Sequence, residues 1–410
     1  MERVGCCVFS VLVCYVILSS AEAKSIPIKH GIGHPVILIP GDGGSQVEAK
    51  LNKTVVPHSY CDKITSDYFN LWLNLELLIP YVLDCWVDNM RLDYDNVTRK
   101  ASEPEGVNIR IPGFGNTTTV EWLDPSQASP GLYFTKIVDA LIALGYTRGL
   151  NIKGAPYDFR RAPNEHGEYF KRLKTLVEQT YYSNGNHKVV LLCHSMGNPM
   201  VLYFLNGQSQ AWKDKFVHSM FALAGVWGGT VKPIRVYASG ENLGVFLLNP
   251  LTLRKQQRST PSLAFLLPSS DFWGPDEVLA TTAQRNYTVK DYKAFFDDLG
   301  YPNGYDSWLD TRDLIDIGKP PGVVVHCLHG AKVDTAERFA WKAGKFPDHQ
   351  PTATYGDGDG TVNMRSLRGC LRWERAQKQK VYERGYKGVD HMGILQHPPI
   401  IDYLQKVLFS

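Results

Sequence analysis

The segment 189–200, VVLLCHSMGNPM, constrains the fold more than any other stretch of the chain. An apolar, β-branched run ends at His194-Ser195-Met196-Gly197, and a segment of helical character follows at once. A strand, tight turn and helix in this order lift a serine hydroxyl clear of the backbone and point the helix N-terminus at it. The layout predicts a nucleophilic serine at Ser195, although Cys193 stands where such a motif usually carries glycine.

Size and charge narrow the class of protein. The chain has 410 residues, 44% of them hydrophobic, which is enough to bury a large core. The formal net charge is +3 with acidic and basic residues interspersed, so we expect no nucleic-acid partner. Residues 1–23 are typical of a secretory signal peptide, since Arg3 precedes an apolar run and Ala21-Glu-Ala23 fits a cleavage site. We expect residues 24–410 to form one domain in a luminal or extracellular space.

The sequons and cysteines fit this route. Four N-x-T sequons occur, at Asn52, Asn96, Asn116 and Asn286. Five cysteines follow the signal segment, and we expect Cys193, at the end of an apolar strand, to be the free thiol. The other four allow three pairings, of which the shortest loops favour Cys61–Cys85 and Cys327–Cys370. No metal-ligand spacing is present, so we expect neither a metal nor a cofactor.

Apolar strands alternate with helical patterns, which predicts a parallel α/β sheet. We expect strands at 35–40, 189–192, 219–224 and 323–328, and helices at 132–144, 169–182, 199–206 and 398–408. Ligands bind at the carboxyl ends of the strands in such sheets. Because the glycine-rich loop 41–44 and Ser195 both follow strand ends, we expect them to share one crevice.

Two stretches lie outside this alternation. Between Cys61 and Cys85, apolar residues recur at helical spacing, at Tyr68, Trp72, Leu75 and Ile79. They predict either a buried core helix or a disulfide-tethered helix that dips into a lipid surface. Residues 226–318 open with Trp227-Gly-Gly229 and mix turns with aromatic residues. After a hydrolase nucleophile, an insertion of this kind is expected to form a cap or lid.

A serine nucleophile needs a base and an acid, which follow it along the chain in α/β-hydrolases. The acid candidates are Asp357 and Asp359, in the glycine-rich run 355–362. His391, in a loop, is the base candidate, whereas His397 precedes two prolines and is expected to be structural. His194 adjoins the serine, but we expect its side chain to point away along the turn.

With these motifs the chain resembles the lecithin:cholesterol acyltransferase family. The resemblance rests on PGDGGSQVEAK at 40–50, IPGFG at 111–115, APYDFR at 155–160, HSMGN at 194–198, WGG at 227–229 and GDGDGTV at 356–362. It implies an α/β-hydrolase fold with a mostly parallel sheet. It also implies a disulfide-tethered membrane-binding segment over about 58–90, with both favoured disulfides, and a cap or lid over about 226–318.

The resemblance also assigns roles to single residues. It implies a triad of Ser195, Asp359 and His391, which selects Asp359 over Asp357. It implies that the backbone amides of Asp42 and Met196 form the oxyanion hole. Lys232 and Trp227 become candidate substrate-binding residues. The candidate membrane-binding residues are Tyr68, Phe69, Leu71, Trp72, Leu75, Leu78 and Ile79.

The activity implied is that of a lysosomal-type phospholipase and transacylase. It would cleave phospholipid acyl esters on a membrane surface and transfer the acyl group to water or to a lipophilic alcohol such as ceramide. We expect the protein to be a monomer. We also expect it to work at acidic pH, because an ionised Asp42 carboxylate would repel an oxyanion. The alternatives are a secreted phosphatidylcholine–sterol acyltransferase and a catalytically silent lipid-binding protein. Members of the sterol branch carry Cys at the positions of Asp42 and Asn198, so both residues favour the first interpretation.

Overall fold

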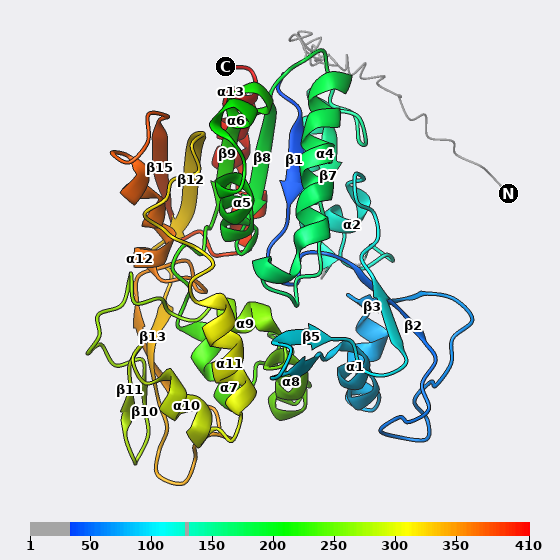
Figure 1. The fold of residues 1–410 in the computed structure, drawn as a ribbon, viewed down its shortest axis with the longest axis vertical. Helices are drawn as coiled ribbons and strands as arrows, with labels where there is room; N and C mark the ends of the chain where they lie inside the picture. The colour runs from blue at the N-terminus through cyan, green and yellow to red at the C-terminus, as the bar shows by residue number, and fades with distance from the viewer. Residues whose placement is uncertain (1–32, 128–130) are drawn as a thin grey trace, which may run out of the picture.

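A six-stranded parallel sheet forms the centre of the molecule in the computed structural model, which describes residues 33–127 and 131–410 (Figure 1). The expected signal peptide lies outside the described residues. The strand order is β15-β12-β9-β8-β1-β7, and every neighbouring pair is parallel. The strands are β1 (Val36–Ile39), β7 (Ile152–Gly154), β8 (Val189–His194), β9 (Val217–Leu223), β12 (Val324–Ala331) and β15 (Val381–Lys387).

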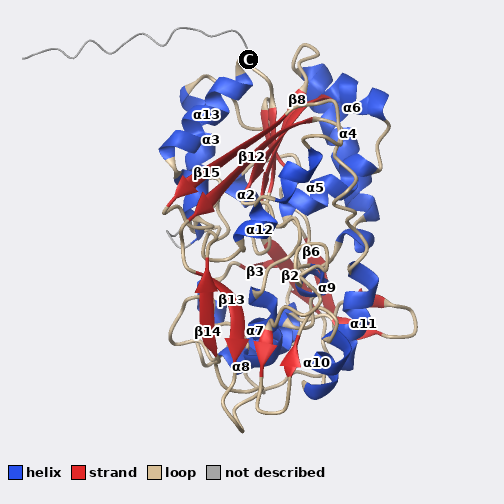
Figure 2. Cartoon of the chain, turned by 90° about the vertical axis from the view of Figure 1, so that its left-hand side faces the viewer, coloured by secondary structure: helices blue, strands red, loops and turns tan. Residues whose placement is uncertain are grey.

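Helices cover both faces of this sheet, as Figure 2 shows. One face carries α3 (Thr135–Ala143) and α13 (Pro398–Leu408), and the other carries α4 (Gly167–Ser183), α5 (Gly197–Asn206) and α6 (Gln210–Phe216). A short helix, α2 (Thr118–Glu121), packs against β7. Strands enclosed on two faces are apolar throughout, and β1 and β8 are buried at every position. The predicted parallel α/β sheet is confirmed.

Four of the six central strands follow the predicted ranges, and the sequence left two unpredicted. β7 has three residues, which is too short to produce a pattern. β15 lies at the sheet edge, and its residues are half-buried or exposed, with none fully buried. Such an edge strand lacks the apolar run that identifies a buried parallel strand.

The segment between Cys61 and Cys85 is not the helix that its spacing predicts. It contains a strand, β3 (Phe69–Trp72), then a 3₁₀ turn, η1 (Leu75–Leu78), and the helix α1 (Leu83–Met90) follows. β3 pairs with β2 (Val47–Leu51), which also pairs with β6 (Val107–Arg110), and both pairings are antiparallel. The open edge of β2 offers ladder hydrogen bonds, and this tertiary pairing overrides a helical periodicity. A two-stranded hairpin of β4 (Asp93–Asp95) and β5 (Lys100–Ser102) comes next.

The segment expected to form a cap lies beyond the carboxyl ends of the central strands (Figure 1). It has its own apolar core, centred on the buried side chains of Trp273, Phe295 and Phe296. Its sheet has the order β11-β10-β13-β14, so it uses residues beyond 226–318. The cap elements are α7 (Lys232–Ser239), α8 (Pro250–Gln257), α9 (Pro261–Phe265), β10 (Ala280–Thr281), β11 (Asn286–Tyr287), α10 (Tyr292–Asp298), α11 (Pro302–Thr311), β13 (Thr335–Ala340) and β14 (Thr352–Gly356).

The described residues also contain several short helices and two disulfides. The remaining helices are η3 (Pro163–Glu165), α12 (Met364–Leu367), η4 (Gly369–Trp373) and η5 (Gly393–Gln396). Both favoured disulfides are present, Cys61–Cys85 and Cys327–Cys370, and Cys193 is a buried free thiol. No helix in 33–127 or 131–410 combines the length and apolarity needed to cross a membrane.

Candidate active site

Ser195 occupies a strained turn between β8 and α5. Its φ is +53°, a conformation that non-glycine residues rarely adopt and that recurs at functional sites. The turn closes tightly because Gly197 has no side chain; a Cβ there would collide with the carbonyl oxygens of Ile39 and Pro40. The predicted strand, turn and helix are confirmed, and Cys193 fits as a fully buried residue of β8.

Ser195, His391 and Asp359 form one hydrogen-bonded chain. His391 Nε2 lies 2.9 Å from Ser195 Oγ, and His391 Nδ1 lies 2.7 Å from Asp359 Oδ2. The geometry fits one tautomer, in which Nδ1–H donates to the carboxylate and Nε2 accepts the serine proton. The backbone strengthens the arrangement, because the amide of His391 donates to the carbonyl oxygen of Asp359 at 2.8 Å.

The surroundings of Asp359 keep it ionised. The residue is fully buried, and burial alone would raise its pKa. The charge and hydrogen bond of His391 outweigh that effect, helped by the amides of Val362 and Thr361 on Oδ1, so the net pKa is lowered. A carboxylate in this state can orient the imidazole and stabilise its protonated form.

The other acid and base candidates lie away from Ser195. Asp357 forms an ion pair with Lys332 at 2.7 Å and also accepts from the Lys332 amide. His397 precedes α13, where its ring contacts Tyr386 edge-on. Neither side chain is hydrogen-bonded to a member of the triad, which agrees with the selection of Asp359 and His391.

The loop 41–44 packs against the nucleophile, as expected from its strand end. A Cβ added at Gly41 would lie 2.6 Å from Cβ of Ser195, so loop and serine are in close contact. Trp72 Nε1 donates to the carbonyl oxygen of Gly43 at 2.8 Å, which ties the loop to β3. Asp42 follows Gly41 in this loop, and Met196 follows Ser195 as the N-cap residue of α5, so both oxyanion-hole candidates adjoin the contact between loop and serine.

Asp42 and Lys232 interact electrostatically at this site. Desolvation raises the pKa of Asp42 to about 6, and the charge of Lys232 acts in the opposite direction. Asp42 is exposed to solvent, and water moderates this rise. Lys232 is the first residue of α7, and its Nζ also lies 3.7 Å from the carboxylate of Glu241.

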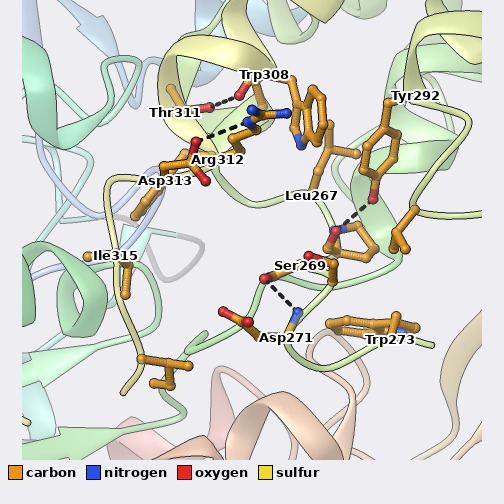
Figure 3. A pocket seen from close by; sticks show the side chains of 18 of the residues that line it. Leu267, Ser269, Asp271, Trp273, Tyr292, Trp308, Thr311, Arg312, Asp313 and Ile315 are labelled. Carbon is orange, nitrogen blue, oxygen red and sulfur yellow. Dashed lines mark hydrogen bonds and ion pairs between the residues drawn. The ribbon is translucent and has the colours of Figure 1, made fainter. Parts of the chain in front are cut away.

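Trp227 is a core residue. It is 3% exposed and its ring packs edge-on against Trp373 at 4.8 Å. It also lines a cavity of about 540 Å³ between residues 264–275 and 308–317. Figure 3 shows Tyr292 and Trp308 at one end of this cavity and Trp273 at the other. The triad side chains do not line it.

The candidate membrane-binding residues separate into two groups. Leu71 and Leu78 are buried in the hydrophobic core, which removes them from any surface. Leu75 and Ile79 are exposed, and so is their neighbour Tyr81. The half-buried remainder comprises Tyr68, Phe69 and Trp72. The asparagines of all four sequons are exposed.

Sequence reasoning missed Tyr133 and the direction of the His194 side chain. That side chain does not point away from the site as expected, because its Nε2 lies 2.9 Å from the carbonyl oxygen of His391. Tyr133 and His194 are buried and hydrogen-bonded to each other at 2.5 Å. Tyr133 precedes α3 and is 61 positions from His194, so no local pattern connects them. Among residues 33–127 and 131–410, no group of His, Cys, Asp and Glu side chains is placed to hold a metal ion.

Comparison with known proteins identifies the family. The family model for lecithin:cholesterol acyltransferase matches residues 68–316 and 305–398. The chain belongs to the lecithin:cholesterol acyltransferase family. It is 46% identical to the human lysosomal phospholipase A and acyltransferase over 376 residues, which cover 92% of this chain and 90% of the relative.

Two further comparisons place the chain more broadly. It is 43% identical to the chicken phosphatidylcholine-sterol acyltransferase, over 88% of this chain and 87% of that one. The named relatives are acyltransferases, so the chain is an enzyme of this family. The crystal structure of the Tle4–Tli4 complex shares the fold with a TM-score of 0.51 and 13% identity, over 92% of this chain and 98% of that one.

Proposed function

We propose that the protein is a serine phospholipase and transacylase that acts on glycerophospholipid esters. The observation that carries this proposal is the Ser195–His391–Asp359 chain, with 2.9 Å between Oγ and Nε2 and 2.7 Å between Nδ1 and Oδ2. The relatives named lysosomal phospholipase A and acyltransferase, in human and mouse, are both 46% identical to this chain. Both observations support the same activity.

The reaction proceeds by acyl transfer in two steps. His391 removes the Ser195 proton as Oγ attacks the ester carbonyl, and the amides of Asp42 and Met196 stabilise the oxyanion. The C–O bond to the lysophospholipid breaks, and His391 returns the proton to that leaving oxygen. Water, or the primary hydroxyl of a lipophilic alcohol such as ceramide, then gives a proton to His391 and takes the acyl group. The bond between the acyl carbon and Oγ breaks, and His391 returns the proton to Oγ, which regenerates Ser195.

Lipid reaches this site from a membrane surface. The segment over about 58–90 is the membrane-binding segment, and its exposed Leu75, Ile79 and Tyr81 support that role. The region over about 226–318, extended by β13 and β14, is the cap, and residues 241–249 at its edge expose Phe246 to 93%. The enzyme acts as a monomer, in the lysosomal lumen or outside the cell.

The acidic working range follows from Asp42. Its carboxylate would repel a neighbouring oxyanion, whereas the protonated form would not. Since the pKa of Asp42 is raised to about 6, acidification below that value removes the opposing charge. A more positive protein surface at low pH also favours binding to anionic lipid.

A product analysis tests the activity and separates it from the two alternatives. Phosphatidylcholine liposomes receive either ceramide or cholesterol as acceptor, from pH 4 to 8, and lysophospholipid, fatty acid and acylated acceptor are measured. We expect acylceramide and free fatty acid at acidic pH. Acylcholesterol as the main product would instead identify a sterol acyltransferase. Ser195→Ala should abolish turnover, and a wild-type protein that resists fluorophosphonate labelling would be a silent lipid-binding protein.

A further inference from the structure

A buried chain of hydrogen bonds connects three segments around the triad. The amide N–H of Gly41 donates to Tyr133 Oη at 2.9 Å. Tyr133 Oη lies 2.5 Å from His194 Nδ1, and His194 Nε2 lies 2.9 Å from the carbonyl oxygen of His391. The chain therefore starts one residue before Asp42 and ends on the backbone of the catalytic base.

Only one arrangement of protons satisfies these contacts. A carbonyl oxygen only accepts, so His194 Nε2 carries the hydrogen that reaches His391. In a neutral ring Nδ1 is then the acceptor, and the Tyr133 hydroxyl donates to it. The same hydroxyl oxygen accepts a hydrogen bond from the amide of Gly41. Every donor in the chain therefore has one acceptor, and every acceptor has one donor.

The protein environment keeps this arrangement across the working range. Burial lowers the pKa of His194 to about 3, and the charge of His391 acts in the same direction. The ring therefore stays neutral where the carboxyl of Asp42 titrates. Burial also raises the pKa of Tyr133, so its hydroxyl keeps its proton. Both side chains are at most 3% exposed, and water has little access to compete for these bonds.

We propose that Tyr133 and His194 are positioning residues that hold the oxyanion loop and the base loop in register with Ser195. The bond to Gly41 fixes the peptide that leads into Asp42, whose amide faces the developing oxyanion in the proposed reaction. The bond from His194 to the carbonyl oxygen of His391 fixes the base on its C-terminal side. The backbone amide of His391 donates to the carbonyl oxygen of Asp359, which fixes its N-terminal side. The inference rests on the proposed function and concerns how its site is built.

The size of the effect follows from the precision that acyl transfer requires. A displacement of about 1 Å in a reacting group can cost roughly 100-fold in rate. Tyr133 hydrogen-bonds to the oxyanion loop through its hydroxyl, while its ring packs closely over Gly44 and edge-on against Phe134 at 4.8 Å. Tyr133→Phe keeps the ring and removes only the hydroxyl, so it isolates the hydrogen bonds from the packing.

The matched control is Tyr146→Phe. Tyr146 is 5% exposed and its hydroxyl donates to the carbonyl oxygen of His34 at 2.9 Å. His34 precedes β1, at the amino ends of the central strands, whereas Ser195 follows the carboxyl end of β8. Both substitutions remove one buried tyrosine hydroxyl, so their effects on the melting temperature should be similar. A merely structural role for Tyr133 would make the two variants alike in activity as well.

The experiment measures kcat and KM for phosphatidylcholine in liposomes, together with the rate of fluorophosphonate labelling of Ser195. For Tyr133→Phe we expect kcat and the labelling rate to fall about 10- to 100-fold with KM within about twofold of wild type. Tyr146→Phe should retain both rates. Equal rates for the two variants, below their melting temperatures, would overturn the inference.

A second pair tests the other end of the chain. His194→Gln keeps an amide N–H that can reach the His391 carbonyl, whereas His194→Phe keeps a ring without a donor. We expect the Gln variant to recover labelling relative to Phe by about 10-fold. Equal labelling of the two would contradict a positioning role for Nε2–H. If the protein is instead catalytically silent, wild type is neither labelled nor active, and if it is a sterol acyltransferase, its main product is acylcholesterol. Both outcomes are recognised before any variant is compared.

Discussion

Asn198 binds the carbonyl oxygen of Ser195 with its own side chain. Nδ2 donates to that oxygen at 3.0 Å and to the carbonyl oxygen of Leu223 at 2.8 Å, and the residue is fully buried. The same amide therefore ties the nucleophile turn to the end of β9. It does so at the position where the sterol branch of the family resemblance carries a cysteine, which has no amide to donate.

Asn198→Ala should destabilise the fold by about 1–3 kcal/mol, because it removes two buried side-chain hydrogen bonds and leaves each carbonyl oxygen with only its backbone donor. Urea unfolding followed by intrinsic fluorescence measures the change. Asn206→Ala is the control, since Asn206 lies at the end of the same helix and its amide donates to one carbonyl oxygen, that of Lys319. A loss no larger than that of the control would show that the turn does not depend on Asn198.

Asp359 and Asp357 should differ sharply in catalysis. Asp359→Asn keeps the shape but no longer fixes the His391 tautomer, which in a serine protease triad costs about 10⁴-fold in kcat. Asp357→Asn removes only the pair with Lys332 and should retain full activity. Steady-state hydrolysis of a soluble ester at saturation compares them, and equal losses would mean that the acid is misassigned.

The pH dependence of activity should change when Asp42 cannot titrate. Its pKa is about 6, so the wild-type rate should rise as the pH falls through that value and the carboxyl becomes neutral. Asp42→Asn is neutral at every pH and should flatten the profile between pH 5 and 7. Because the charge of Lys232 lowers the pKa of Asp42, Lys232→Met should move the rise to higher pH. A profile unchanged in both variants would exclude Asp42 as the titrating group.

Stability should fall in the range where activity rises. Burial lowers the pKa of His218 and of His326 to about 4 in the folded state, against about 6.5 in an unfolded chain. Between these values the unfolded chain binds more protons, so acidification from pH 7 to 4 costs folding free energy, about 1–3 kcal/mol per histidine. Asp42, with a raised pKa, opposes this in part.

Differential scanning calorimetry checks that balance. The melting temperature should drop from pH 7 to pH 4.5, and the drop should be smaller in His218→Gln. The control is His187→Gln, because His187 is exposed and lies just before the amino end of β8, next to His34. In this variant the melting temperature should drop as much as in wild type. A melting temperature that rises on acidification would contradict the sign.

Membrane association should depend on Ile79, which is 51% exposed. Ile79→Asp places a charge where the proposed lipid contact lies, and sedimentation with anionic liposomes should decrease by about 10-fold or more. Val97→Asp is the control, because Val97 is 86% exposed on the β4–β5 turn and outside the proposed segment. Equal binding of both variants would remove Ile79 from the contact.

The sequence predicted those structural features whose signal lies within a single segment of the chain. Buried strands such as β8 and β9 have an apolar run of their own, and the Ser195 turn lies between two such signals. The segment after Cys61 shows the limit, because its strand exists through pairing with β2, a long-range contact that periodicity cannot report. The choice of Asp359 over Asp357 also required the family resemblance, since both aspartates share one glycine-rich run.

Tyr133 and His194 show a further limit. Each is an ordinary residue in its local context, and their relation appears only when α3 and β8 are packed together. The cap sheet also lacks a local sequence signal, because β10 pairs with β13, which begins 54 residues after the end of β10. Features assembled from distant segments are set by the fold as a whole.

The burial of Cys193 has a practical consequence for spectroscopy. It is the free cysteine of the described residues, fully buried, and burial raises the pKa of its thiol. Maleimide and methanethiosulfonate reagents need an accessible thiolate, so they should leave the native folded region unmodified. A cysteine introduced at Phe246 could then carry a dye or a spin label without removal of any cysteine from the described region. The label would report whether residues 241–249 change their environment on contact with lipid.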